Sequence, residues 1–250
     1  IPLPLTLKYI TECKLTDNSG TNFLIRPQSC HFYKNVHTSK SLIKPISQIE
    51  IIKTLSHKFD FLKRKTHLIE LGYDLYGDIP DGLNYSIFYK GFNMPDTFFS
   101  WFLVTELHVW MLMVRFMAEG EKGKLVINKM VEAMWHDVLV RAELLVLIYP
   151  NLFLLYRNFI SLPMTPRTKK RQVTELSYQF NAAIVGYDEG IMSDDKVLAS
   201  ALWRRFFCLE CNNPEHLEKL LIYVRKQINV FDKIPSEKVF DKSVAKWVDL

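Results

Sequence analysis

The chain lacks the residue patterns by which most enzymes are recognised. It has no HExxH zinc-protease motif, no GxSxG nucleophile turn, no Walker A phosphate loop and no GxGxxG dinucleotide motif. A di-iron site in a helical bundle needs Glu-x-x-His on two helices, and no Glu here precedes a His by three positions. The sequence therefore predicts a protein that is not an enzyme and has no metal or other cofactor.

Cys208 and Cys211 form a CxxC pair that could bind zinc or act in redox chemistry. Structural zinc needs four ligands, and the residues left to complete a site are Cys13, Cys30 and His216. Redox CxxC pairs sit at a helix N-terminus, where the dipole lowers a thiol pKa. This pair instead closes a predicted helix, where the dipole has the wrong sign for lowering a thiol pKa, so we interpret it as structural.

Two histidines and one glutamate could also ligate a metal or haem. Glu132 and His136 are four residues apart and share a helix face. A pair alone is a poor metal site, and a hydrogen bond on the helix surface is our preferred interpretation. If the protein handled haem, His108 and His136 would be the candidate core ligands, and structural histidines are the alternative.

Two clusters of charge suggest binding surfaces. Tyr187, Asp188 and Glu189 lie with Asp194 and Asp195 around a predicted turn whose spacing does not match a Ca²⁺-binding EF loop. We expect either an acidic docking surface or a solvated turn there. Lys169, Lys170 and Arg171 start a predicted helix, where the dipole disfavours positive charge. They suggest an external anion, such as RNA phosphate or anionic lipid, with a solvated basic face as the alternative.

Helical spacing of apolar residues dominates the sequence, and strand alternation is almost absent. After Pro45 we expect a first helical hairpin that ends at the turn-rich residues 77–82. The later helices are expected over residues 83–91, 95–117, 125–144 and 167–187, from a cap at residues 193–195 to about 211, and from Pro214 onwards. The sequence thus predicts an all-α bundle of about six to eight helices with a flexible N-terminal arm.

The expected helix at residues 95–117, with Asn93 as its capping residue, is the most apolar in the chain. Its polar side chains, which include Glu106, His108 and Arg115, would leave only a narrow wet strip. A helix that is apolar around most of its circumference lies in the middle of a bundle or in a membrane. Because charges inside a bilayer are costly, we predict the central core helix, with the wet strip facing solvent.

Residues 145–162 form an unusually apolar stretch in which Arg157 is the one charge. Eighteen residues approach the length that spans a bilayer, but Pro150 interrupts the stretch early. A core loop is our first interpretation, ahead of a membrane-surface or partner-facing hairpin and of a full span.

The composition describes an ordinary globular chain with an unusual N-terminal arm. With 48% hydrophobic and 13% aromatic residues in 250, the chain has ample core material, which excludes disorder over most of its length. Residues 1–44 hold six basic and two acidic residues, and so carry most of the net charge of +5. This arm is rich in Ser and Thr, which is typical of an organelle transit peptide. A flexible arm without a targeting signal is the alternative.

Several long segments resemble one family, the ubiquinol–cytochrome c reductase chaperones. The segments are NMPDTFFSWFLVTELHVWMLMVRF (93–116), MWHDV (134–138), LSYQFNAAIVGYDEGIMSDD (176–195), LASALWRRFF (198–207) and PEHLEKLLIYVRKQI (214–228). The resemblance assigns residues 45–235 to the helical chaperone domain, with 145–162 as an atypical apolar insertion and 236–250 as a C-terminal tail.

The resemblance implies an assembly factor of respiratory complex III rather than an enzyme. Family members are helical and act on the matrix side of the mitochondrial inner membrane. With a small partner protein they bind newly made cytochrome b near the mitochondrial ribosome. The alternative is an RNA- or lipid-binding mitochondrial adaptor without a dedicated client.

On this basis we expect three surfaces. The wet strip (Glu106, His108, Arg115) and the acidic turn (Tyr187, Asp188, Glu189) would contact the partner or client. Lys169, Lys170 and Arg171 would face ribosomal RNA or the anionic inner-membrane surface.

Overall fold

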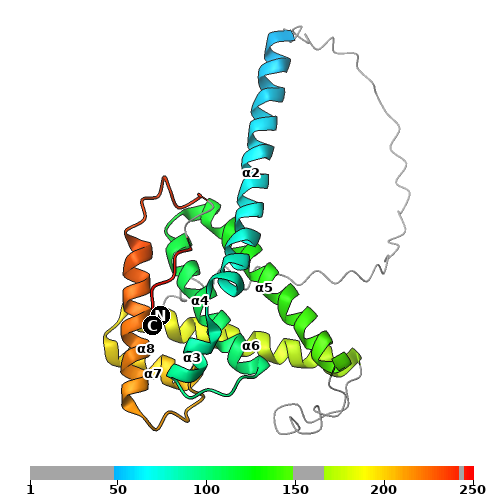
Figure 1. Ribbon diagram of the computed structural model, residues 1–250. Helices are drawn as coiled ribbons and strands as arrows, with labels where there is room; N and C mark the ends of the chain where they lie inside the picture. The colour runs from blue at the N-terminus through cyan, green and yellow to red at the C-terminus, as the bar shows by residue number, and fades with distance from the viewer. Residues whose placement is uncertain (1–47, 149–165, 242–244) are drawn as a thin grey trace, which may run out of the picture. The chain divides into compact units, whose positions relative to one another are not determined.

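The computed structural model describes residues 48–148, 166–241 and 245–250. They fall into two parts that are treated separately: residues 48–65, and the domain from Thr66 to Leu250. The helices, labelled α2–α8 in Figure 1, account for most of the described residues, and no strand occurs among them. The predicted all-α fold is confirmed there. The expected arm (1–44) and most of the apolar stretch 145–162 lie outside the described residues.

Helix α2 (Gln48–Gly82) is one long helix. The predicted turn at residues 77–82 is wrong, because α2 continues through Gly77 and even contains Pro80. Burial explains why the turn signals are overridden: Leu75 and Ile79 are fully buried in the domain core. Before Thr66, the helix exposes the rings of Phe59 and Phe61.

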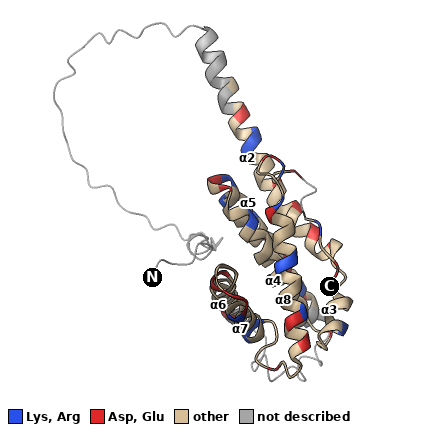
Figure 2. Cartoon of the chain, turned by 90° about the vertical axis from the view of Figure 1, so that its left-hand side faces the viewer, with Lys and Arg blue, Asp and Glu red and all other residues tan. Residues whose placement is uncertain are grey.

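Helix α4 (Phe98–Met117) is the centre of the domain and follows the short helix α3 (Tyr85–Gly91). It contacts α3, α5, α6 and α8, and Figure 2 shows it tan over most of its length. It is long and apolar enough to cross a membrane, yet 83% of its most apolar window is buried inside the domain. The predicted core helix is therefore confirmed.

The start of α4 differs from the prediction. Its capping residue is Thr97, whose Oγ1 accepts a hydrogen bond from the Ser100 backbone N–H at 3.2 Å. Asn93 instead has a positive φ of 53° in the loop that follows α3, and it does not cap α4. The predicted helix was right in place but began three residues too early.

Helix α5 (Gly120–Ile148) begins at Gly120 rather than at residue 125. Gly120 has a φ of +61°, a conformation that glycine adopts without strain and that lets the chain reverse directly after α4. Gly123 then lies against α4, where a Cβ would come 1.9 Å from the Phe116 carbonyl oxygen. Both glycines therefore belong to the first turn of α5.

The remaining helices are α6 (Pro166–Met192), α7 (Asp195–Arg205) and α8 (Pro214–Asp232). The predicted cap of α7 is confirmed, because the Asp194 carboxylate accepts the Val197 backbone N–H at 3.0 Å. Helix α7 ends at Arg205, before the predicted residue 211, and α8 begins at Pro214 as predicted. Helix α6 runs past residue 187, so Tyr187, Asp188 and Glu189 are helical and do not form the predicted turn.

Candidate functional site

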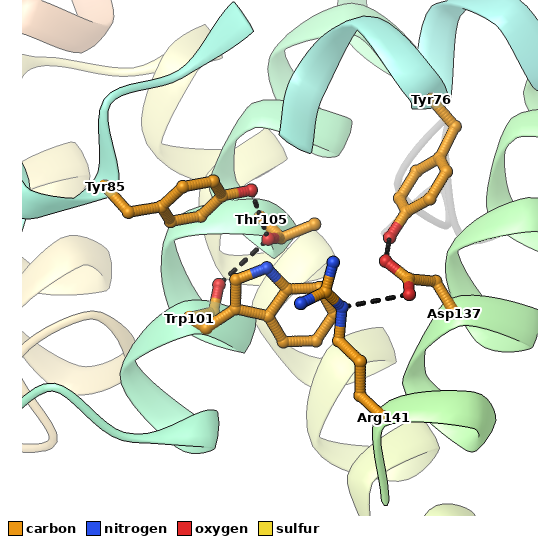
Figure 3. Close-up of polar contacts among 6 residues, drawn as sticks. All are labelled: Tyr76, Tyr85, Trp101, Thr105, Asp137 and Arg141. Atoms are coloured by element: carbon orange, nitrogen blue, oxygen red, sulfur yellow. Dashed lines mark hydrogen bonds and ion pairs between the residues drawn. The ribbon is translucent and has the colours of Figure 1, made fainter. Parts of the chain in front are cut away.

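A polar and aromatic junction joins four helices of the domain, as Figure 3 shows. Tyr76 of α2 donates a hydrogen bond to Asp137 Oδ2 of α5 at 2.7 Å. Arg141, one turn further along α5, donates to Asp137 Oδ1 at 2.9 Å and places its guanidinium 4.4 Å from the Trp101 ring centroid of α4. Hydrogen bonds and a cation–π contact thus hold α2, α4 and α5 together.

The fourth helix of this junction, α3, joins through Tyr85. Thr105 donates its hydroxyl hydrogen to the Trp101 carbonyl oxygen at 2.9 Å, so Tyr85 is the donor in its 2.9 Å hydrogen bond to Thr105. We call these six residues the four-helix junction: Tyr76, Tyr85, Trp101, Thr105, Asp137 and Arg141.

The phenols of the junction are poor acids. Burial, followed by the hydrogen bond to Asp137, raises the pKa of Tyr76 far above its usual value. Burial also raises the pKa of Tyr85, and raises that of the neighbouring Tyr89 to about 12. All three phenols are neutral at physiological pH, so Tyr76 and Tyr85 contribute hydrogen bonds rather than charge to the junction. Its accessible part is Arg141, whose side chain is 43% exposed.

A second polar centre lies deeper, where α4 meets α6 and α7. The Glu106 carboxylate is fully buried and accepts two hydrogen bonds from Arg205, at 2.7 and 2.6 Å. Arg205 also donates to Gln179 Oε1 of α6 at 3.0 Å. Burial raises the pKa of Glu106, and the hydrogen bonds and charge of Arg205 oppose that rise. Because arginine keeps its proton, we treat the pair as ionised.

His108 lies on α4 with both ring nitrogens engaged. Nδ1 lies 2.6 Å from the Val104 carbonyl oxygen, to which it must donate, so Nε2 accepts from the Tyr223 hydroxyl of α8 at 2.7 Å. Burial lowers the pKa of His108 to about 4, and the ring is neutral at physiological pH.

Arg115 fastens α4 to the end of α8. It donates to the Phe231 and Ile234 carbonyl oxygens at 3.1 and 2.8 Å and forms an ion pair with Glu119 at 2.7 Å. Carbonyl oxygens at a helix C-terminus lack helical partners and favour a positive charge. The guanidinium therefore works as a cap for α8.

The expected wet strip on α4 is wrong. Glu106 and His108 are fully buried and Arg115 is 6% exposed. The physical reason is that each polar group has a partner on another helix, which offsets its desolvation. Their assignment to a partner-binding surface stays a prediction, and in this fold these side chains do not reach solvent.

The acidic residues of α6 are divided between the core and the surface. The Tyr187 ring is fully buried, 5.0 Å from that of Trp110, and the Trp110 indole N–H donates to Asp188 Oδ1 at 2.9 Å. Glu189 is exposed. Of the acidic cluster's three α6 residues, Glu189 is the one whose side chain a partner could reach. Lys169, Lys170 and Arg171 lie in the first turns of α6, and their side chains are outside the described residues.

The sequence candidates for metal binding are not assembled into a site. Glu132 accepts hydrogen bonds from Tyr73 and Lys129 at 2.7 and 2.6 Å, while His136 is exposed. Cys208 and Cys211 carry free thiols in the loop after α7. Within the described ranges, no group of three His, Cys, Asp or Glu side chains is placed to hold a metal ion.

Sequence reasoning missed the partners that give these polar residues their role. Arg205 and Asp137 belong to segments that resemble the family, yet no local signal pairs Arg205 with Glu106, which lies 99 positions away. Nothing in the sequence around Arg141 or Tyr76, apart from their residue types, indicated that they belong to a polar site.

Over the described residues, the fold and site define an all-helical domain in which the buried side chains of Glu106, His108 and Arg115 are each paired with another part of the domain. The sequence profile described as "Ubiquinol-cytochrome C chaperone" matches residues 90–146 and 162–247. The chain therefore belongs to this family, and residues 147–161 interrupt the match. No solved structure matches the chain.

Relatives across animals and yeast agree with this membership. Ubiquinol-cytochrome c reductase complex assembly factor 1 of Drosophila melanogaster is 43% identical over 205 residues, covering 80% of this chain and 73% of its own length. Its namesake in Homo sapiens is 34% identical over 87% of this chain and 69% of its own length. "Protein CBP3, mitochondrial" of Saccharomyces cerevisiae is 30% identical over 69% of this chain and 48% of its own.

Proposed function

We propose that this protein is a mitochondrial assembly factor of respiratory complex III that acts by binding rather than by catalysis. Its client is newly synthesised cytochrome b, which it binds together with a small partner protein near the mitochondrial ribosome, on the matrix side of the inner membrane. The observation that carries the proposal is the family match over residues 90–146 and 162–247, joined by relatives named as complex III assembly factors.

Exposed apolar side chains on α5 support a role in binding an apolar client. Leu139, Val140 and Leu144 are 44%, 41% and 48% exposed, and they flank the half-exposed Arg141 of the four-helix junction. Neighbouring exposed apolar side chains mark interaction surfaces more often than isolated ones do. The junction fixes the position of this helix face, to which a hydrophobic client segment would bind.

The test compares two variants that place negative charge at exposed apolar positions. Val140→Asp and Leu144→Asp together should reduce cross-linking to newly synthesised cytochrome b and leave helicity unchanged. Ile222→Asp on α8, where the side chain is 58% exposed, is the matched control and should keep wild-type cross-linking. Equal loss in both variants would argue against the α5 face, and no cross-linking of the wild-type chain to cytochrome b would argue against the client.

Glu189 is our candidate for contact with the small partner protein. Its side chain is exposed on α6, whereas the neighbouring Tyr187 and Asp188 are buried in the core. Glu189→Lys therefore changes the surface charge and leaves the core packing unchanged. We expect this variant to weaken partner binding in a pull-down with purified components. A complex of unchanged stability would assign Glu189 to the solvated surface.

An RNA- or lipid-binding adaptor is the second candidate, favoured by the basic residues at the start of α6. Replacement of Lys169, Lys170 and Arg171 by Ala should reduce ribosome or membrane association and its salt sensitivity. An adaptor should bind RNA or liposomes without its partner protein, whereas a client chaperone should need that partner. Unchanged co-sedimentation of the triple variant at low salt would refute a role for these three residues.

A further inference from the structure

Residues 245–250 lie on the domain without forming a helix or a strand. Their backbone is held by Gln227 of α8, whose side chain is fully buried. Gln227 Nε2 donates to the Lys246 carbonyl oxygen at 2.9 Å, and Gln227 Oε1 accepts from the Val248 backbone N–H at 2.8 Å. One amide thus pairs with the donor and the acceptor on either side of Trp247, as a neighbouring strand would.

The Trp247 side chain fills an aromatic recess between helices. Its ring centroid lies 4.7 Å from that of His108 at an angle of 77°, and 5.5 Å from that of Phe231. Its indole N–H points at the Asp78 carbonyl oxygen, 3.4 Å away. Helices α2, α4 and α8 therefore each contribute a wall. We call the recess with its amide the Trp247 groove: Asp78, His108, Gln227 and Phe231.

The contacts of residues 245–250 are those of a bound peptide. Main-chain hydrogen bonds give affinity and a side-chain pocket gives selectivity in extended-peptide recognition. Here the Lys246 and Asp249 side chains are exposed, and Trp247 enters the recess. The family profile extends through residue 247, so the tryptophan is part of the matched region.

We propose that the Trp247 groove is a peptide-binding site for an extended segment with a tryptophan, which the chain's own residues 245–250 occupy in cis. A partner protein with such a segment displaces residues 245–250 and takes their place on Gln227. Because residues 245–250 are tethered to the domain, their effective concentration at the groove is high and weak competitors are excluded. A partner binds the groove only when residues 245–250 are released or when the partner outcompetes them. This site is independent of the proposed role in complex III assembly.

The test uses full-length protein and a fluorescein-labelled peptide of sequence AKWVDL. Trp247→Ala empties the recess, so this variant should bind the peptide at least about tenfold more tightly than wild type, in which the tether competes. Trp203→Ala, which removes a 36% exposed tryptophan on α7, is the matched control and should behave as wild type. The peptide AKAVDL should not bind. Equal peptide affinity in wild type and Trp247→Ala, or no binding to a natively folded Trp247→Ala, would overturn the proposal.

A second measurement covers the case in which Trp247→Ala does not fold. In wild type, excess AKWVDL should speed hydrogen exchange at the Val248 amide, because the peptide takes over the hydrogen bond to Gln227. AKAVDL at the same concentration is the control. Exchange at Val248 that ignores both peptides would refute displacement.

Discussion

Removal of Arg205 should leave a costly defect in the domain core. In Arg205→Met, the fully buried Glu106 loses both of its hydrogen bonds and its counter-charge. Breaking a buried ion pair by removing one partner costs about 3–5 kcal/mol. A second estimate agrees: if the stranded carboxyl takes up a proton instead, the cost at pH 7.4 is about 4 kcal/mol, from 1.36 kcal/mol per unit above an unfolded pKa of about 4.3.

The stranded Glu106 carboxyl also makes the stability of this variant depend on pH. Without Arg205, burial alone acts on Glu106 and raises its folded pKa above the unfolded value. Stability is then fully present below the unfolded pKa and is lost as the pH rises through the folded one. The destabilisation of Arg205→Met should therefore become smaller as the pH falls from 7.4 to 5.5. Adding Glu106→Gln, which cannot ionise, should recover much of the loss at pH 7.4 and remove the pH dependence.

Urea unfolding followed by circular dichroism at 222 nm measures these free energies, with Lys124→Met as the control. Lys124 pairs with an 85% exposed Glu121, and loss of such a surface pair costs about 0–1 kcal/mol. If Arg205→Met were no less stable than Lys124→Met, or if its loss did not depend on pH, the buried ionised pair would be refuted.

Three further predictions test other parts of the structure in the same assay. Gly190→Ala places a Cβ 2.7 Å from the α7 backbone and should cost about 1–3 kcal/mol, while Gly77→Ala, which meets nothing within 4 Å, should be neutral or stabilising. Wild type should lose up to about 3 kcal/mol as the pH falls from 6.5 to 4, because folding depresses the pKa of His108 to about 4; a His108→Gln variant that kept this slope would refute the assignment. Asp188→Lys should unfold the domain, whereas Glu189→Lys should change stability by less than about 0.5 kcal/mol; equal stabilities would contradict the burial of Asp188.

The sequence predicts the helices well because local periodicity and caps determine them. Helices α4, α7 and α8 follow from an apolar run, the Asp194 cap and Pro214. The turn predicted at residues 77–82 is wrong because it rested on local turn residues alone, the run from Gly77 to Gly82. Tertiary burial of Leu75 and Ile79 decided that region, and no local signal reports it.

The candidate site was less predictable because its partners are distant in sequence. Polar residues on a helix are expected to face water, and this led us to place Glu106, His108 and Arg115 on a wet strip. Each is instead buried against a partner about 100 positions away, such as Arg205 or Tyr223. The sequence shows which polar residues α4 carries, but only the three-dimensional structure shows which residues they pair with.

The central claim is that this protein holds newly made cytochrome b during complex III assembly. The most direct measurement is purification of the tagged full-length chain from gently solubilised mitochondria, with the co-purifying proteins identified and quantified by mass spectrometry. We predict cytochrome b together with one small partner protein in stoichiometric amount. Ribosomal proteins or lipid without cytochrome b would contradict the claim and support the adaptor.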